Sequence, residues 1–257
     1  MGRVTLRLYG PLNDFLPRES RQRDVVRDAP LPCSVKDLLE SSGVPHPEIG
    51  LILIDGGPVG FEAPVPAGAR IAAYPTFVRL DASALPALRP PLPSPPAFVL
   101  DGHLGTLARR LRLAGFDALY ENHADDEALA ERAARGGRVL LTRDVELLKR
   151  RLVEFGAFVR ATERAAQFVE VVERFDLAPH MLPFTRCPRC NGMLRVATAD
   201  EVAERVPERV RQRGGPFMVC ASCGHPYWEG SHTARIRQAM GTLIFCMRRA
   251  TDSGASS

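Results

Sequence analysis

The chain has 257 residues, of which 45% are hydrophobic and 25% charged, and this ordinary globular usage excludes a disordered chain, a collagen-like fibre and a coiled coil. No run approaches the roughly 18 apolar residues that a membrane helix needs, and the opening MGRVTLRLYG alternates charged with apolar residues. We therefore expect a cytoplasmic protein with no membrane partner. The net charge of +4 is uneven, because residues 181–257 carry 11 basic and 6 acidic side chains, a balance of +5 that can attract a phosphate backbone.

Residues 1–80 show the pattern of a small α+β domain. RVTLRLY at 3–9 alternates like a half-buried strand, and SVKDLLESSGV predicts a helix with Ser34 as its N-cap. LILIDGGPV and ARIAAYPTF predict further strands, the first of them running into a turn. This order resembles the β-grasp fold of ubiquitin and of the bacterial sulfur carriers. Those carriers end in a free Gly-Gly, whereas Gly56-Gly57 is internal here, so we expect a hairpin turn and no sulfur transfer.

The next segment, residues 81–96, is predicted to be a proline-rich linker, because six prolines fall within positions 81–97 and proline favours extended backbone. From residue 97 to residue 180 the pattern changes to regular alternation of short apolar strands and amphipathic helices. Such alternation predicts a parallel sheet with helices on its faces, and ligands then bind beyond the carboxyl ends of the strands.

Four carboxylates lie at that expected edge. Asp101 and Asp144 end two predicted strands, while Asp125 and Asp126 open a helix. Converging carboxylates repel one another unless a hard cation such as Mg²⁺ or Mn²⁺ offsets their charge. The structural alternative is that Asp125 is only an N-cap, that Asp126 favours the helix dipole, and that the strand-end acids belong to turns.

The stretches FVLDGHLGTLARRLRLAGFDALY and DDEALAERAARGGRVLLTRD resemble the PIN-like ribonuclease unit found at the C-terminus of the Mut-seven exonuclease. The same unit occurs in bacterial proteins after a ubiquitin-like module and before a zinc ribbon, and the resemblance covers about residues 1–240. It implies a nuclease in which Asp101, Asp126 and Asp144 bind Mg²⁺ or Mn²⁺ and cut RNA, with Asp125 as a neighbouring candidate. Only 24 residues separate Asp101 from Asp126, fewer than in full PIN domains, and Glu121 is a candidate substitute for the acid that this segment normally carries.

Two Cys-x-x-Cys motifs, CPRC and CASC, predict a structural zinc site made of Cys187, Cys190, Cys220 and Cys223. The 29 residues between the motifs exceed the usual spacing, and TADEVAERVPERVRQRGG is interpreted as a helical insertion. A redox pair is the alternative, but a thioredoxin-like strand and helix are not apparent around either motif.

The stretch YWEGSHTARIRQ follows the second motif and matches the family's Y-W-x-G-S-H sequence, which implies a site role for His232 near the carboxylates. The alternative is a loop and helix that pack the ribbon against the nuclease unit. We expect Trp228 to pack in the core, and Arg109, Arg110 and Arg112 to lie on a solvated helix face. Residues 181–245 are assigned to the zinc ribbon and a C-terminal helix, and residues 246–257 to a flexible tail.

The sequence therefore predicts an α/β protein with an N-terminal β-grasp module, a PIN-like parallel α/β domain at residues 97–180 and a C-terminal zinc ribbon. The leading hypothesis is a metal-dependent ribonuclease that acts on single-stranded RNA, with zinc as a structural ion. One alternative is a non-catalytic RNA-binding or adaptor protein whose carboxylates are relics. Another gives the main role to the β-grasp module, which would bind a protein partner or a translation complex.

Overall fold

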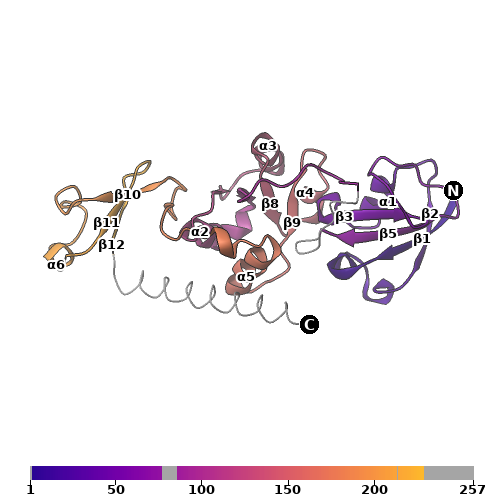
Figure 1. Cartoon of the computed structure of the whole chain (residues 1–257), viewed down its shortest axis with the longest axis horizontal. Coiled ribbons are helices and arrows are strands. Elements are labelled where there is room, and N and C mark those ends of the chain that lie inside the picture. The colour runs from indigo at the N-terminus through magenta and orange to yellow at the C-terminus, as the bar shows by residue number, and fades with distance from the viewer. Residues whose placement is uncertain (1, 77–85, 213, 229–257) are drawn as a thin grey trace. The chain divides into compact units, whose positions relative to one another are not determined.

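The computed structural model describes residues 2–76, 86–212 and 214–228 (Figure 1). The chain divides into two compact units, one made of Met1–Leu104 and Glu121–Arg160, the other of Gly105–Tyr120 and Ala161–Ser257. None of the helices in the described part of the chain reaches the length and apolarity of a transmembrane span.

The N-terminal module is a five-stranded sheet in the order β2-β1-β5-β3-β4 with one α-helix. Its elements are β1 (Gly2–Leu8), β2 (Val25–Ala29), α1 (Val35–Ser41), β3 (Ile49–Ile54), β4 (Gly57–Pro58) and β5 (Arg70–Pro75). β1 and β5 are parallel, whereas the β1–β2, β3–β4 and β3–β5 pairs are antiparallel. The predicted β-grasp fold is confirmed, including the N-cap, where the Ser34 hydroxyl accepts a hydrogen bond from the Asp37 N–H at 3.1 Å.

The internal diglycine lies at a hairpin turn, as predicted, and Gly57 is the first residue of β4. Asp55 and Gly56 connect β3 to β4 with φ values of 50° and 86°, which is the left-handed region that tight hairpins use. β2 was not among the expected strands. It is an edge strand with Val26 59% exposed, and its charged neighbours hide the alternation on which a sequence prediction relies.

The central sheet has the order β7-β6-β8-β9, and the β6–β8 and β8–β9 pairs are parallel. Its strands are β6 (Phe98–Leu100), β7 (Ala118–Tyr120), β8 (Val139–Thr142) and β9 (Gly156–Phe158). The accompanying helices are α2 (Gly105–Leu113), α3 (Asp126–Gly136), α4 (Val145–Leu148) and α5 (Arg164–Arg174). Every residue of β6 and β8 is buried, as expected for strands covered on both faces, so the predicted parallel α/β fold is confirmed.

The N-terminal module contacts β9 within the first compact unit. Glu48 is only 1% exposed, and its carboxylate accepts the Phe158 N–H at 2.6 Å and Nη2 of Arg160 at 3.0 Å. The Nε2–H of His46 donates to the carbonyl oxygen of Val153 at 2.8 Å. A buried carboxylate and a buried imidazole therefore hold this module against the end of the central sheet.

The third sheet is antiparallel, in the order β10-β11-β12, and its strands are β10 (Leu194–Ala197), β11 (Phe217–Cys220) and β12 (Pro226–Trp228). The helical insertion between the cysteine motifs is only partly confirmed. α6 (Glu208–Gln212) is a short helix, the residues before Pro207 form turns, and proline at this position prevents one continuous helix from spanning the insertion. The turns still contribute to a small core, since Val202 and Val206 are buried.

Candidate active site and candidate metal centre

A single hydroxyl group connects the ends of two neighbouring strands. Asp101 follows β6 directly, and Thr142, the last residue of β8, is completely buried. Oγ1 of Thr142 donates to Oδ2 of Asp101 at 2.8 Å and accepts the N–H of Asp144 at 2.9 Å. The hydroxyl has one proton, which it donates to Asp101, so one side chain orients this carboxylate and binds the backbone of Asp144.

Asp144 is exposed and is oriented by the helix that it precedes. Its Oδ1 accepts the N–H groups of Glu146 at 2.8 Å and Leu147 at 3.2 Å, which makes Asp144 the N-cap of α4. Oδ2 makes no hydrogen bond to any residue that the structure describes. The N-cap therefore fixes one carboxylate oxygen and leaves the other open to a ligand.

The two acids at the start of α3 are engaged in different ways. Asp125 is the N-cap, and its Oδ1 accepts the Ala128 N–H at 2.8 Å. Asp126 is the first residue of the helix, and its half-exposed carboxylate lies 3.4 Å from Nη2 of Arg150. The capping geometry explains why two adjacent acids occur here without requiring that both face a metal.

Other residues expected at this site have separate surroundings. Glu121, the candidate substitute acid, forms an ion pair with Arg132 at 2.6 Å. His232 lies outside the described residues, as do the residues after Trp228 that were expected to form a C-terminal helix and tail. Over the described ranges, the four cysteines are the only group of three or more Asp, Glu, His or Cys side chains placed to hold a metal together.

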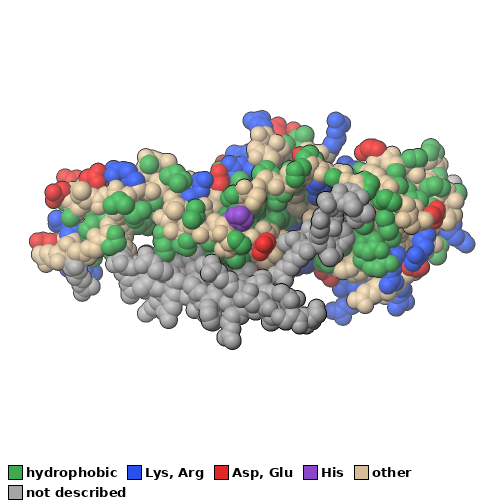
Figure 2. All heavy atoms as spheres, viewed as in Figure 1, with side chains coloured by type: hydrophobic (Ala, Val, Ile, Leu, Met, Phe, Trp, Pro, Cys, Tyr) green, Lys and Arg blue, Asp and Glu red, His purple; other side chains and the backbone are tan. Residues whose placement is uncertain are grey.

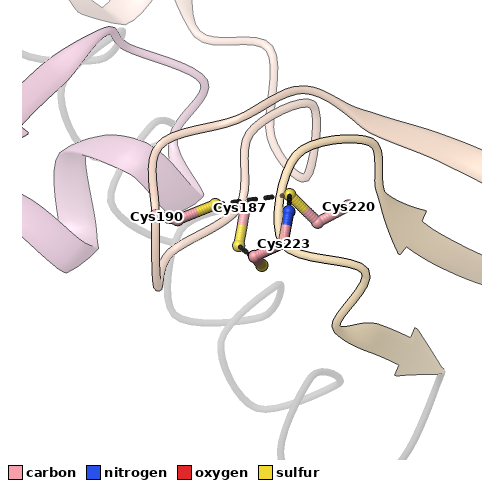
Figure 3. A group of neighbouring side chains, drawn as sticks. All are labelled: Cys187, Cys190, Cys220 and Cys223. Carbon is pink, nitrogen blue, oxygen red and sulfur yellow. Dashed lines mark hydrogen bonds between the residues drawn. The ribbon is translucent and has the colours of Figure 1, made fainter.

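The four cysteine thiols converge as the paired motifs predict (Figure 3), and their Sγ atoms all lie within 4.8 Å of one another. The Cys187–Cys223 and Cys190–Cys220 sulfur pairs are 3.8 and 3.4 Å apart. Four Zn–S bonds of about 2.3 Å in a tetrahedron require sulfur–sulfur edges of about 3.8 Å. The thiols are free, and their number and spacing fit a zinc ion.

The two motifs are built on the same turn. The N–H of Asn191 donates to the Cys187 carbonyl oxygen, and the N–H of Gly224 donates to the Cys220 carbonyl oxygen, both at 2.9 Å. Asn191 and Gly224 therefore occupy equivalent positions, with φ values of 70° and 69°. The cysteine-rich turns are thus two matched knuckles, one before β10 and one at the end of β11.

The surroundings of the thiols differ in their effect on ionisation. Burial opposes ionisation of Cys220, but hydrogen bonds from the Cys223 and Ser222 N–H groups and the neighbouring thiols lower its pKa to about 7. Burial raises the pKa of Cys190 to about 12, with the neighbouring thiols adding to the effect and a backbone bond from Gly192 opposing it. Burial and a hydrogen bond to Cys187 raise the pKa of Tyr227, whose Oη lies 3.0 Å from that sulfur. A bound cation would be needed to keep the Cys190 thiol ionised beside Cys220.

Two residues at this centre were missed by sequence reasoning. Arg112 was expected on a solvated helix face, yet it is 5% exposed, so that prediction is wrong. Burial lowers the pKa of its guanidinium, and the nearby Cys187 and Cys190 thiols act in the opposite direction. Asn191 was not singled out, although aligning CPRCNG with CASCGH places it opposite Gly224 and would have indicated its left-handed conformation.

Comparison with protein families gives two matches. The model described as the Mut7-C RNAse domain matches residues 96–240, which is more than half of the chain, and the model described as Mut7-C ubiquitin matches residues 1–81. Comparison with curated proteins and with solved structures gives no match.

Proposed function

Because the chain belongs to the Mut7-C RNase domain family, we propose that it is a metal-dependent ribonuclease that cleaves single-stranded RNA. Membership in this family indicates a nuclease or RNA-related function. The catalytic metal, the phosphodiester bond as the target and the roles of individual residues are our proposal. The observation that supports it most is the Thr142 hydroxyl, which binds both Asp101 and the backbone of Asp144 at the carboxyl ends of adjacent parallel strands.

Our proposal places a hard divalent cation at this edge of the sheet. One carboxylate oxygen of Asp101 accepts the Thr142 hydroxyl and one of Asp144 caps α4, and carboxylate oxygens are the ligands that Mg²⁺ and Mn²⁺ prefer. Asp126 is the third proposed ligand. Its ion pair with Arg150 joins two half-exposed side chains, and such pairs contribute only about 0–1 kcal/mol, so the pair does not prevent Asp126 from binding a metal.

We assign separate tasks to the residues of this chain. Thr142 orients Asp101, while the α4 N-cap orients Asp144. A divalent cation at these carboxylates would supply a Lewis acid and lower the pKa of its bound water, which is the chemistry that phosphodiester hydrolysis needs. We propose that His232 contributes to the same site and that Asp125 acts chiefly as a cap.

The zinc ribbon is proposed to help hold the RNA. Over the described part of residues 181–228 there are six basic and four acidic side chains, a balance of +2, and both signs are interspersed around β10–β12 and α6 on the face shown in Figure 2. The remainder of the +5 balance belongs to Arg213 and residues 229–257. RNA affinity should therefore depend on salt and on the ribbon as well as on the carboxylates.

The test is cleavage of a fluorescent single-stranded RNA at increasing Mn²⁺ concentrations. Asp101→Asn combined with Asp144→Asn should abolish metal-stimulated cleavage. Glu146→Gln is the matched control, since Glu146 is 79% exposed and lies two residues after Asp144. Asp125→Asn keeps an oxygen that can cap α3, so its activity separates a capping role from a metal role. Cleavage that survives the double substitution would show that another site or a contaminant is responsible.

A non-catalytic RNA-binding protein is the second candidate. The observation that favours it is that, among the described residues, no three carboxylates lie close enough together to hold one metal ion. RNA binding with a steep salt dependence, together with no Mn²⁺-stimulated cleavage, is the result that would select this function.

A further inference from the structure

The buried guanidinium of Arg112 contacts the backbone of the first knuckle. Arg112 lies at the C-terminal end of α2, and its Nε donates to the carbonyl oxygen of Ala118 at 2.8 Å. Its Nη1 donates to the carbonyl oxygens of Pro188 and Arg189 at 3.2 and 3.0 Å. These are the two residues between Cys187 and Cys190, so one side chain joins α2, the start of β7 and the metal-binding turn.

Asn191 makes a second connection between the same segments. Its Oδ1 accepts the Ala118 N–H at 3.1 Å, and its Nδ2 donates to Oδ1 of Asp117 at 2.8 Å. Its own carbonyl oxygen accepts Nη1 of Arg186 at 3.0 Å, and Nη2 of Arg186 lies 3.7 Å from Oδ2 of Asp117. Asn191, which completes the first knuckle, is therefore held in place by hydrogen bonds of both its backbone and its side chain.

The chain that leads into the knuckle also packs tightly on the end of α2. The N–H groups of Leu182 and Phe184 donate to the carbonyl oxygens of Ala114 and Leu113 at 2.9 and 3.0 Å. Gly115, with φ of 100°, leaves no room for a Cβ because one would collide with the Leu182 carbonyl oxygen. The C-terminal end of α2 and the first knuckle thus form one continuous hydrogen-bonded body.

We propose that Arg112 is the charge partner of the four-cysteine site and that Arg112 and Asn191 couple zinc binding to the ordering of residues 112–118. Four thiolates around Zn²⁺ carry about two negative charges in excess, and a buried guanidinium beside them offsets part of this charge. The same guanidinium fixes the turn that presents Cys187 and Cys190. Zinc binding and the α2–β7 connection consequently stabilise each other, because linkage between two sites is reciprocal.

Three variants separate the charge from the hydrogen bonds. Arg112→Gln removes the charge, Arg112→Lys keeps it but loses the planar fork, and Asn191→Gly keeps the left-handed backbone while it removes the amide contacts. Arg109→Gln is the control, since Arg109 is an exposed arginine on the same helix. The readouts are the rate of zinc transfer to a chromogenic chelator and hydrogen exchange at residues 112–118 before and after zinc removal, both on the full chain.

Arg112→Gln should release zinc about 10- to 100-fold faster than wild type, because residues that orient a metal site from outside its ligands contribute about this factor to metal affinity. Arg112→Lys and Asn191→Gly should fall between Arg112→Gln and wild type, and Arg109→Gln should match wild type. Chelation of zinc from the wild-type protein should accelerate exchange at residues 112–118, so the proposal remains testable even if a variant fails to fold. Release from Arg112→Gln at the Arg109→Gln rate, or unchanged exchange at residues 112–118 after chelation, would overturn it.

Discussion

Substituting Glu48 tests whether the buried ion pair between the N-terminal module and β9 stabilises the protein. Glu48→Ala removes the acceptor of the Phe158 N–H and leaves Arg160 without its buried partner. Breaking such a pair costs about 3–5 kcal/mol when the remaining charge is fully buried. Arg160 is 23% exposed and still contacts Asp14, so we expect the lower limit, about 3 kcal/mol, or a decrease in Tm of about 6–12 °C.

Urea unfolding of Glu48→Ala, Arg160→Met and the double variant measures the coupling between the two side chains. The double variant should be more stable than the sum of the single effects predicts, with an interaction energy of about 1–3 kcal/mol, because removing both partners leaves no unpaired charge. Hydrogen exchange at the Phe158 amide should accelerate in Glu48→Ala. A cost under about 1 kcal/mol for Glu48→Ala, or additive effects of the two substitutions, would show that the ion pair does not stabilise the protein.

Three further outcomes are expected. Cys190→Ser should release zinc and lower Tm, whereas Asp101→Asn and the control Cys33→Ser should keep wild-type zinc content, measured by mass spectrometry beside melting curves. Thr142→Val should destabilise the chain by about 1–3 kcal/mol and reduce Mn²⁺-stimulated cleavage, while Thr142→Ser, which keeps the hydroxyl, should retain both properties. Hydrogen bonds from two backbone N–H groups at the start of α5 lower the pKa of Glu163 below its ordinary value of 4.5. The ionised Glu163 carboxylate therefore stabilises the folded chain fully above pH 4.5, and this contribution is lost as the pH falls through the lowered pKa. Wild type and Glu163→Gln should consequently differ in Tm at pH 7 and have converging Tm values in acid.

Elements with strong local patterns could be predicted from the sequence. Continuous apolar runs that end in Asp101 and in the Thr-Arg-Asp motif identified the central strands, and spacing identified the four cysteines. α4 is shorter than its apolar pattern suggests. It ends at Leu148 because the chain must turn toward β9, and the buried Val153 anchors that turn through its N–H to the Arg150 carbonyl oxygen.

Residues whose partners are distant in the sequence could not be found in this way. Arg112 looks like a surface arginine because its acceptors, the carbonyl oxygens of Pro188 and Arg189, lie 76 and 77 positions away. Every residue has a backbone carbonyl oxygen, so the identities of Pro188 and Arg189 do not indicate that they accept hydrogen bonds from Arg112. Thr142 was similarly overlooked beside Asp144, because its role depends on the neighbouring strand that ends at Asp101.

The two matched knuckles differ in whether they contact residues outside the ribbon. At the shared left-handed position the first knuckle has Asn191, which binds Asp117 and Ala118, whereas the second has Gly224, which has no side chain to make such a contact. The carbonyl oxygen of Gly224 accepts a bond from Arg205, itself part of the ribbon's insertion. The first knuckle is therefore anchored to residues 117 and 118 outside the ribbon, whereas the hydrogen bonds described for the second lie within the ribbon, to Arg205 and Met193. Zinc is thus the bond that ties the second knuckle to the anchored one, and we expect the order of the Cys220–Cys223 turn to depend on the metal more than that of the Cys187–Cys190 turn.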